Sequence, residues 1–306
     1  MKKASSFIAT HEDKKQLENK LIASFMEASE NEKFNNLIEK LNLPIEELSK
    51  YTSTLEDCAV EYDRCRYCKG LAACKNKIEG HAYLPKVHNN KLEFGYMPCK
   101  YQQKFEEETK YLKNVYCIDI PKEIRKAKMK DIFVDDQNRF ETINWLKDFI
   151  KTYEKNPHQK GLFLTGTFGC GKTYLIAATL NELAKKNVKS GIIFWPDFLR
   201  NLKSKFKDNY EEEINYIKKL PILCIDDIGA ETTTTWSRDE VLCPIVQYRM
   251  QEHLPTFFTS NFDYKTLEKH FSASKDGVEE VKAKRIIERI IQLTNSSEII
   301  SDNLRK

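Results

Sequence analysis

The fold of this chain is decided by the stretch Gly166-Thr167-Phe168-Gly169-Cys170-Gly171-Lys172-Thr173. It satisfies the pattern G-x-x-x-x-G-K-[ST], in which a strand precedes the glycines and a helix follows them. The residues just before it, GLFLTG (161–166), form a short apolar run that predicts a strand, and a helical pattern covers Tyr174–Lys186. We therefore predict a phosphate-binding loop here rather than an ordinary glycine-rich turn.

The chemistry of this loop follows from its residue types. Glycines let the backbone bend so that its N–H groups face phosphate oxygens, and the N-terminus of the following helix adds a favourable dipole. Lys172 would reach the β- and γ-phosphates, and the hydroxyl of Thr173 would bind Mg²⁺. The residues predicted to bind the nucleotide in this segment are Gly166, Thr167, Phe168, Gly169, Cys170, Gly171, Lys172, Thr173 and Tyr174.

A second apolar run ends in two carboxylates. Residues 220–226 (LPILCID) predict a buried strand, and Asp227 follows it directly. We assign Asp226 to the Mg²⁺ ion and Asp227 to the attacking water, as its base. Two acidic residues at the end of a strand can also cap the next helix, but the phosphate-binding loop upstream argues against that alternative.

Strands and helices alternate from residue 138 onward. Apolar strand patterns occur at 161–166, 190–196, 220–226 and 255–261, with helical sequence between them. Strands that alternate with helices imply a parallel sheet, and their almost continuous apolar character implies helices on both faces. The predicted class of this region is α/β, a parallel sheet sandwiched by helices.

The region before residue 138 differs in composition and in the spacing of its apolar residues. Residues 1–50 carry apolar residues at helical spacing, such as Leu17, Leu21 and Phe25. Residues 58–99 have weak periodicity and are rich in cysteine, glycine, asparagine and proline. Small modules held together by a metal have this composition, so we predict a small helical domain with a metal-binding segment.

Five of the nine cysteines lie within residues 58–99. The pair Cys65-x2-Cys68 has a spacing that lets two thiolates reach one tetrahedral Zn²⁺, and four protein ligands would make that zinc structural. The other ligands are not determined by spacing alone. We favour the set Cys65, Cys68, His81 and Cys99, with Cys74 as the leading substitute and His88 and Cys58 as further candidates.

The composition is that of a soluble globular protein, which we expect in the cytoplasm. The chain has 306 residues, 41% of them hydrophobic, and a formal net charge of +4. No export signal or membrane span is expected, since the apolar runs are far shorter than the roughly 20 residues that a spanning helix needs. Thiols stay reduced in the cytoplasm, which favours metal ligands over disulfides. We expect a helical zinc-binding domain at 1–113, a linker at 114–137 and an α/β domain at 138–306.

The order of these motifs resembles the AAA+ ATPase family. The resemblance implies ATP as the nucleotide and a sensor role for Asn261, which ends the strand FFTSN. The segment KRIIERI is similar to the box-VII helix of the initiator and loader clade. By that likeness Arg289 is the arginine finger of a neighbouring ATP site, with Arg285 as runner-up, and Arg305 is a weak candidate for sensor 2.

The whole chain resembles the DnaI-type bacterial replicative-helicase loaders. The landmarks are CRYCKGLAACKN, GTFGCGKTYL, LCIDDIGAE and AKRIIERI. The resemblance implies an N-terminal domain that grips the hexameric replicative helicase. It also implies an ATPase domain that self-associates and contacts single-stranded DNA during primosome assembly, together with other initiation proteins. Hydrolysis would act as a slow, partner-stimulated switch with ATP, Mg²⁺ and Zn²⁺ bound.

Two other functions and two structural alternatives remain open at this point. An IstB-type transposition accessory ATPase shares the loader-like core but is not expected to carry the Cys/His segment. A non-catalytic adaptor would bind nucleotide without turning it over. The basic helix at 197–207, with Phe198 and Phe206, suits single-stranded DNA as well as it suits a plain amphipathic helix. The apolar stripe of residues 17–41 could dock on a helicase or form the core of its own domain.

Overall fold

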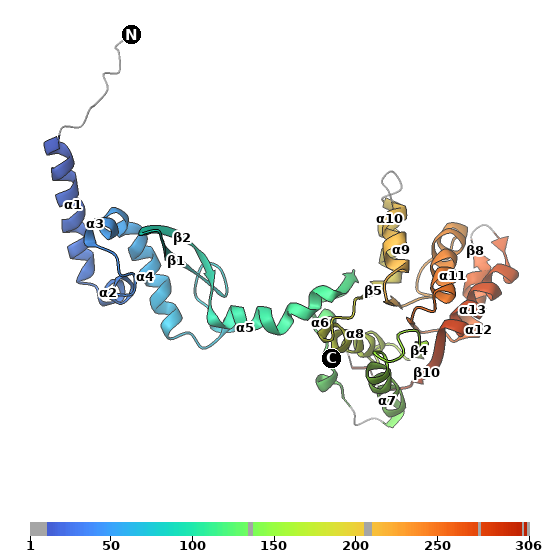
Figure 1. Cartoon of the computed structure of the whole chain (residues 1–306). Coiled ribbons are helices and arrows are strands. Elements are labelled where there is room, and N and C mark those ends of the chain that lie inside the picture. The colour runs from blue at the N-terminus through green and yellow to red at the C-terminus, as the bar shows by residue number, and fades with distance from the viewer. Residues whose placement is uncertain (1–10, 134–136, 205–209, 275–276, 302, 305–306) are drawn as a thin grey trace, which may run out of the picture. The chain divides into compact units, whose positions relative to one another are not determined.

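The computed structural model describes residues 11–133, 137–204, 210–274, 277–301 and 303–304. The chain divides into two compact units, Met1–Thr109 and Lys110–Lys306 (Figure 1). Each unit has its own hydrophobic core. None of the helices in the described part of the chain combines the length and the apolar character that a membrane span requires.

The first unit combines helices with one antiparallel hairpin. Its core is built around Phe25, Phe34 and Leu55, so part of the N-terminal apolar stripe is used inside the unit. The backbone N–H of Tyr83 donates to Glu61 Oε2 at 2.7 Å and ties the hairpin to the preceding helix. The elements of the unit are α1 (His11–Ser29), α2 (Glu32–Ile38), α3 (Ile45–Leu48), α4 (Thr52–Arg66), β1 (His81–His88), β2 (Lys91–Pro98) and α5 (Lys100–Thr109).

The hairpin between the cysteines is a feature that the sequence analysis did not anticipate. Asn89 and Asn90 connect β1 to β2 and both have positive φ angles, +49° and +57°. A two-residue turn with two such angles matches the twist of the strands, and asparagine tolerates this conformation better than most residues. The turn residues, rather than an apolar alternation, therefore account for the hairpin.

The second unit is a six-stranded parallel sheet in the order β10-β4-β7-β6-β5-β3. Its strands are β3 (Val115–Ile118), β4 (Gly161–Gly166), β5 (Ser190–Phe194), β6 (Ile222–Asp226), β7 (Thr256–Ser260) and β10 (Thr294–Ile299). Its helices are α6 (Lys122–Arg125), α7 (Gln137–Thr152), α8 (Lys172–Lys185), α9 (Trp195–Ser204), α10 (Tyr210–Lys218), α11 (Cys243–Gln251), α12 (Tyr264–Ser272) and α13 (Glu280–Leu293). A π-helical segment, Trp236–Leu242, leads into α11, and the short strands β8 (Ala273–Ser274) and β9 (Gly277–Val278) pair between α12 and α13.

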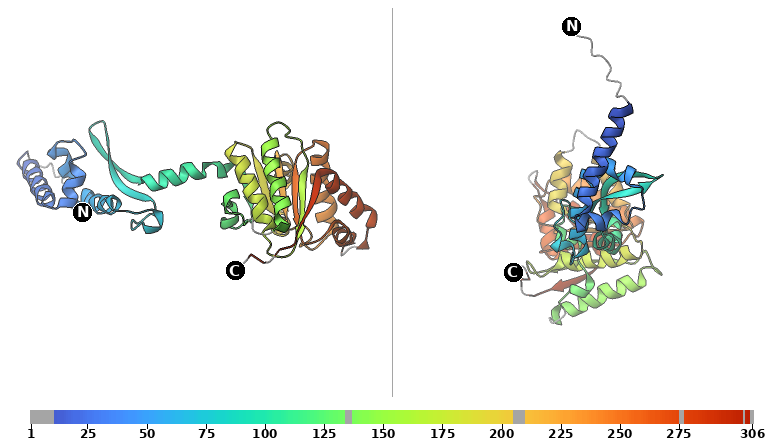
Figure 2. Two further views of the ribbon diagram at one scale, coloured as in Figure 1. Left: turned by 90° about the horizontal axis from the view of Figure 1, so that it is seen from below. Right: turned by 90° about the vertical axis from the view of Figure 1, so that its left-hand side faces the viewer.

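Helices cover both faces of this sheet, as Figure 2 shows. Strand β6 illustrates the cause, because successive side chains of a strand point to opposite faces. Leu223 and Ile225 pack into the core shared with α9–α13, while Ile222 and Cys224 pack into the core shared with α7 and α8. The predicted parallel sheet with helices on both faces is therefore confirmed.

Two strands of the sheet were not predicted, and both lie at its edges. Strand β10 has the polar sequence TNSSEI, and β3 is only four residues long. The segment 114–137, assigned above to a linker, contains β3 and α6 and so belongs to the second unit. Edge strands bury fewer side chains than central ones, which leaves little apolar pattern to detect.

Candidate nucleotide-binding site

The predicted phosphate-binding loop connects β4 to α8 at the carboxyl end of the sheet. Gly171 precedes α8 with a φ of +87°, a left-handed conformation that favours glycine. A Cβ on Gly166 would lie 2.0 Å from the carbonyl oxygen of Ile299 in β10. Only glycine allows this approach of the two backbones, so the glycines are required by the path of the chain.

Lys172 lies within the loop and is only 8% exposed. Its Nζ donates to the carbonyl oxygens of Gly166 and Thr167 at 2.9 and 3.0 Å. It also donates to Asn261 Oδ1 at 2.8 Å. Lys172 therefore joins the loop to the residue that follows β7.

Asp226 ends β6 and is held by two hydroxyl groups. Thr173 Oγ1 and Thr259 Oγ1 donate to its Oδ1 at 2.8 and 2.7 Å. Burial raises the pKa of the Asp226 carboxyl to about 6; the charge of Asp227 also raises it, while the hydrogen bonds and Lys172 lower it. A buried carboxylate beside a threonine hydroxyl is an arrangement that can hold a divalent cation.

Asp227 and Asn261 complete the network. The Nδ2 of Asn261 donates to Asp227 Oδ1 at 3.1 Å, so its amide side chain links Lys172 with Asp227. The backbone N–H of Asp227 donates to Thr259 Oγ1 at 2.8 Å, and its φ of +57° turns the chain sharply after β6. The structure thus brings together five predicted site residues: Lys172, Thr173, Asp226, Asp227 and Asn261.

The structure adds two residues that the sequence analysis missed. Thr259 lies on β7 and bonds both acidic residues, as described above. Arg139 lies on α7, is 3% exposed and donates from Nη1 to the carbonyl oxygen of Cys170 at 3.0 Å. Its Nε has no hydrogen-bond partner among the described residues. Arg139 lies on the same helical face as the buried Ile143 and Leu146. A charged residue on a face that otherwise packs into the core is the sequence signal that could have identified it.

The segment after β10 also packs on the loop. The hydroxyl of Thr167 donates to the carbonyl oxygen of Ser301 at 2.8 Å, and the N–H of Leu304 donates to that of Gly169 at 3.0 Å. The neighbouring Arg305, predicted as a weak sensor-2 candidate, lies outside the described residues. The described part of this segment therefore holds the outer side of the loop.

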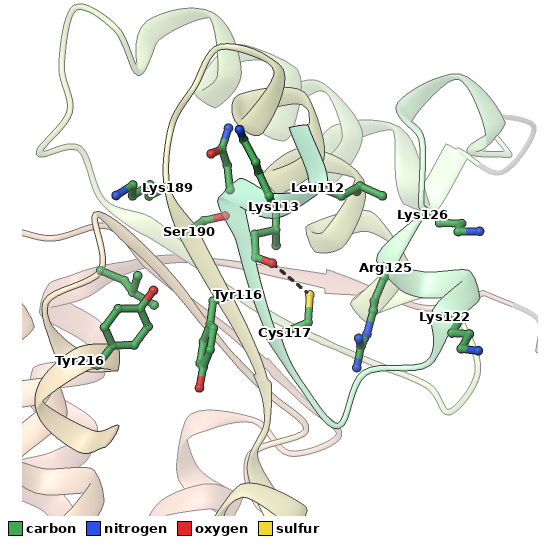
Figure 3. A pocket seen from close by; sticks show the side chains of 13 residues that line it. Leu112, Lys113, Tyr116, Cys117, Lys122, Arg125, Lys126, Lys189, Ser190 and Tyr216 are labelled. Atoms are coloured by element: carbon green, nitrogen blue, oxygen red, sulfur yellow. Dashed lines mark hydrogen bonds between the residues drawn. The ribbon is translucent and has the colours of Figure 1, made fainter. Parts of the chain in front are cut away.

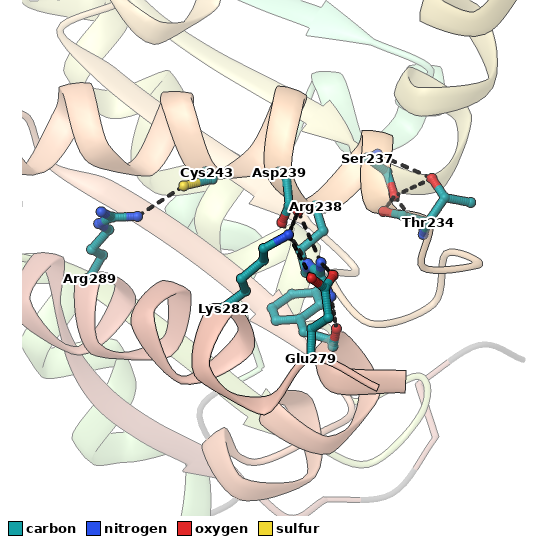
Figure 4. Close-up of polar contacts among 9 residues, drawn as sticks. Thr234, Ser237, Arg238, Asp239, Cys243, Glu279, Lys282 and Arg289 are labelled. Atoms are coloured by element: carbon teal, nitrogen blue, oxygen red, sulfur yellow. Dashed lines mark hydrogen bonds and ion pairs between the residues drawn. The ribbon is translucent and has the colours of Figure 1, made fainter. Parts of the chain in front are cut away.

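The two finger candidates lie on α13 and differ in exposure. Arg289 is half-buried and donates from Nη1 to Cys243 Sγ on α11 at 2.9 Å (Figure 4). Arg285, one turn earlier, is exposed. The buried Arg238 of the π-helical segment forms ion pairs with Asp239 and with Glu279, which directly precedes α13, and so ties that segment to the start of α13.

The cysteines of the first unit converge on the turn before β1. The N–H of Gly80 donates to Cys74 Sγ at 3.4 Å, and the N–H of Cys99 donates to the carbonyl oxygen of Gly80 at 2.8 Å. The pKa of the Cys65 thiol is raised, first by burial and then by the charges of Cys99, Cys74 and Cys68, while a hydrogen bond from Asn76 lowers it. The contacts of Asn76 and Gly80 therefore gather Cys65, Cys74 and Cys99 around this turn, and the N–H of Cys68 donates to the carbonyl oxygen of Cys65.

The hairpin register separates the two histidine candidates. His81 pairs with Pro98, next to Cys99, whereas His88 pairs with Lys91 at the other end of the hairpin. At ~3.3 Å per residue the two histidines are about 23 Å apart along β1, so His88 cannot join the cysteines. Cys58 is buried in the core of the unit and is excluded as well.

His81 lies beside the cysteines through its backbone, because Asn76 Nδ2 donates both to the carbonyl oxygen of His81 at 2.9 Å and to Cys65 Sγ at 3.3 Å. Its imidazole Nδ1 lies 3.0 Å from the carbonyl oxygen of Glu79. Among the described residues, no group of three or more Cys, His, Asp or Glu side chains is arranged closely enough to hold a metal.

The fold and the site define a P-loop nucleotide-binding protein of the α/β class. No protein-family model matches the chain. The chain is 37% identical over 262 residues to the replicative helicase loader DnaI of Bacillus subtilis (strain 168), and the match covers 84% of each protein. The chain therefore belongs to the DnaI family of replicative helicase loaders.

Solved structures agree with this assignment. A crystal structure of DnaI matches 64% of this chain and all of its own, with a TM-score of 0.57 and 45% identity. The crystal structure of the DnaC helicase loader covers 58% of this chain with a TM-score of 0.51 and 20% identity, and it shows the shared fold.

The raised pKa of Asp226 predicts that this carboxylate destabilises the folded protein when no cation is bound. We expect Asp226→Asn to raise the free energy of unfolding by up to about 3 kcal/mol in EDTA at pH 8. Asparagine can keep both hydroxyl hydrogen bonds without a buried charge. The stability difference between Asp226→Asn and wild type should be largest above pH 6. It should shrink as the pH falls from 6 to 4, because the wild-type carboxyl becomes protonated in the folded chain over that range.

Urea unfolding of both proteins across this pH range measures the difference. Asp148→Asn, on the exposed side of α7, is the control and should change stability little at any pH. Equal stability of Asp226→Asn and wild type at pH 8 would contradict the prediction.

Proposed function

We propose that this protein is an ATP-dependent loader that binds the hexameric replicative helicase and helps place it on single-stranded DNA during primosome assembly. The observation that carries the proposal is the network joining Lys172, Asn261 and Asp227 beside the Thr173–Asp226 pair, in a member of the helicase-loader family. The protein would act in the cytoplasm, with other initiation proteins of the primosome.

The residues present fit ATP and Mg²⁺. The glycine-rich loop leads directly into α8, which begins at Lys172, so that backbone N–H groups of the loop and of the helix N-terminus are available to phosphate oxygens. Thr173 and Asp226 would hold Mg²⁺, whose charge offsets that of the phosphates. Asp226 supports this role because a cation would relieve the cost of burying its carboxylate.

The chain's own groups account for the rest of the ATPase proposal. Asp227 would accept a proton from a water molecule and orient it. Asn261 would hold Asp227 in place through its amide N–H groups while its carbonyl accepts from Lys172. If Lys172 turned to bind phosphates, Asn261 would lose its bond from Lys172. Because Asn261 follows β7, the nucleotide state would in this way change the contacts at the end of that strand.

The loading reaction is tested by separating helicase binding from helicase placement. We expect Lys172→Ala to bind the helicase of the same cell as wild type does, but to place at least tenfold less of it on a single-stranded DNA circle with ATP. The loss follows because the lysine side chain is needed to bind and neutralise the phosphates. Lys151→Ala, an exposed lysine on α7, is the matched control.

Two outcomes would contradict the loader proposal. Placement by Lys172→Ala at the wild-type level would show a non-catalytic adaptor. A wild-type protein that ignores the helicase but stimulates a transposase would show the IstB-type function. The separate first unit with its cysteine cluster supports the loader over the transposition protein.

A second part of the proposal concerns self-association. We expect Arg289 on α13 to reach the ATP site of a neighbouring copy, which requires it to leave Cys243. Arg289→Ala should then keep ATP binding but lose at least tenfold in hydrolysis at high protein concentration, because a finger acts only in the assembled state.

Arg285→Ala is the control for this prediction, measured by the same ATPase titration. Undiminished turnover of Arg289→Ala would reject the finger. A selective loss in Arg285→Ala would transfer the role to the exposed arginine.

The third part concerns the first unit, which we propose binds the helicase and is stabilised by zinc. We propose that Cys65, Cys68, Cys74 and Cys99 hold one structural Zn²⁺, with Cys74 in the place given above to His81. The contacts around the turn support this set: N–H groups of Asn76 and Gly80 donate to the sulfurs of Cys65 and Cys74, and the N–H of Cys99 donates to the carbonyl oxygen of Gly80. In the described structure the thiols are not close enough to hold a metal, so zinc binding would require them to move together. A tetrahedral zinc would join α4 to the start of the hairpin.

Metal analysis of purified variants tests the ligand set. Cys74→Ser should lose zinc and helicase binding while ATP binding is kept, and His81→Ala and His88→Ala should keep zinc, because neither belongs to the four-thiol group. Zinc loss in His81→Ala but not in Cys74→Ser would restore His81 to the set. A wild-type protein free of zinc would exclude the site.

A further inference from the structure

A basic pocket lies along β3, the edge strand of the large sheet (Figure 3). It encloses about 460 Å³, and all of its lining residues belong to the second unit. No carboxylate is among these lining residues, and five exposed cations are: Lys113, Lys122, Arg125, Lys126 and Lys189. A hollow with this charge attracts polyanions.

The pocket also presents aromatic surface. The rings of Tyr116 on β3 and Tyr216 on α10 meet edge to face, with centroids 5.0 Å apart and planes at 74°. Tyr216 is 50% exposed, and the contact with Tyr116 limits its freedom to move. A fixed, half-exposed ring is a platform on which any nucleic-acid base can stack.

A third observation is the hydroxyl of Ser190. Ser190 lines the pocket from β5, where it pairs with Val115 of β3, and is only 1% exposed. Its Oγ has no hydrogen-bond partner among the described residues. A buried hydroxyl without a partner costs free energy, and a ligand oxygen or nitrogen at this place would supply one.

This pocket is separate from the nucleotide site. Val115 and Ser190 begin their strands, whereas the phosphate-binding loop and Asp226 lie at the carboxyl ends of theirs. In a parallel sheet the amino and carboxyl ends of the strands lie at opposite ends of the sheet. The ATP proposed above therefore does not account for the five cations.

The basic helix predicted to contact DNA is less suited to it than its sequence implies. On α9, Phe198 is fully buried and cannot stack on a base. Arg200 pairs with Asp197 at 2.5 Å, and Lys203 lies 5.4 Å from the ring of Trp236. Lys205, Phe206 and Lys207 lie outside the described residues.

We propose that the β3 pocket, lined by Lys113, Tyr116, Lys189, Ser190 and Tyr216 among others, binds single-stranded DNA. One base stacks on Tyr216, and the flanking phosphates lie against the cations. The proposal rests on the loader function, for which contact with a single strand is required. A strand fits better than an acidic peptide because the pocket combines cations with an aromatic platform. Sequence would not be discriminated, since charge and stacking act on any base.

Fluorescence anisotropy with a labelled oligothymidylate tests the proposal, using the full chain with and without ATP. We expect Lys113→Glu with Lys189→Glu to weaken binding at least tenfold and to lower the salt slope by about 1.4, about 0.7 per lost phosphate contact. Tyr216→Ala should weaken binding about tenfold and Tyr216→Phe far less, because phenylalanine keeps the ring. The matched control on α9 is Arg200→Glu with Lys203→Glu, which should bind as wild type.

ATP binding checks that each variant is folded, because the pocket residues lie away from the proposed ATP site. Wild-type affinity in the pocket variants, or a loss confined to the α9 variant, would overturn the proposal. So would displacement of the oligomer by thymidine monophosphate at equal affinity, which would indicate a site for free nucleotides. Loss of helicase binding with DNA binding intact would indicate a protein-docking surface instead. A wild-type protein that does not bind single strands, alone or with helicase, would overturn the DNA part of the loader function itself.

Discussion

The need to satisfy a buried carboxylate and a buried ammonium group organises the nucleotide-binding unit. Asp226 and Lys172 are both almost fully covered, so each must find partners from neighbouring strands. The strand order places β7 between β4 and β6, and Thr259 on β7 and Asn261 just after it supply those partners. The sheet, the loop and the acidic strand end are therefore interdependent. Moving any one of the three would leave a charge without its hydrogen bonds.

This network has a stability cost that fits a nucleotide switch. The raised pKa of Asp226 shows that its charged form is disfavoured in the folded chain. A cation would relieve that cost, so the site gains more from binding than an already neutral site would. The described segment after β10 and Arg139 hold the loop from two further sides. Rigid support of this kind keeps the glycine-rich backbone in the shape that phosphates require.

The first unit has less packing to stabilise it than the second. Its core of aromatic and aliphatic residues is small, and the turn that carries the cysteines adds little apolar surface to it. A shared metal would replace the packing that such a segment cannot supply. The helicase-binding role proposed for this unit and the chemistry proposed for the second would then depend on separate stabilising groups. This separation is why the variants proposed for one unit are expected to spare the other.

The sequence by itself determined the parallel sheet and five of the residues that meet at the phosphate-binding loop, because glycine-rich loops and apolar strands leave local patterns; Thr259 and Arg139 were found only in the structure. The four central strands and the phosphate-binding loop were found at or within a few residues of their observed positions. Features that depend on contacts between residues distant in the sequence were decided only by the tertiary structure. Strands β3 and β10 lack a strong pattern of their own and exist because a neighbouring strand offers hydrogen bonds. The convergence of Cys74 with Cys65, the burial of Phe198 and the pocket around Tyr216 likewise depend on which residues distant in sequence become neighbours. No local spacing encodes that information.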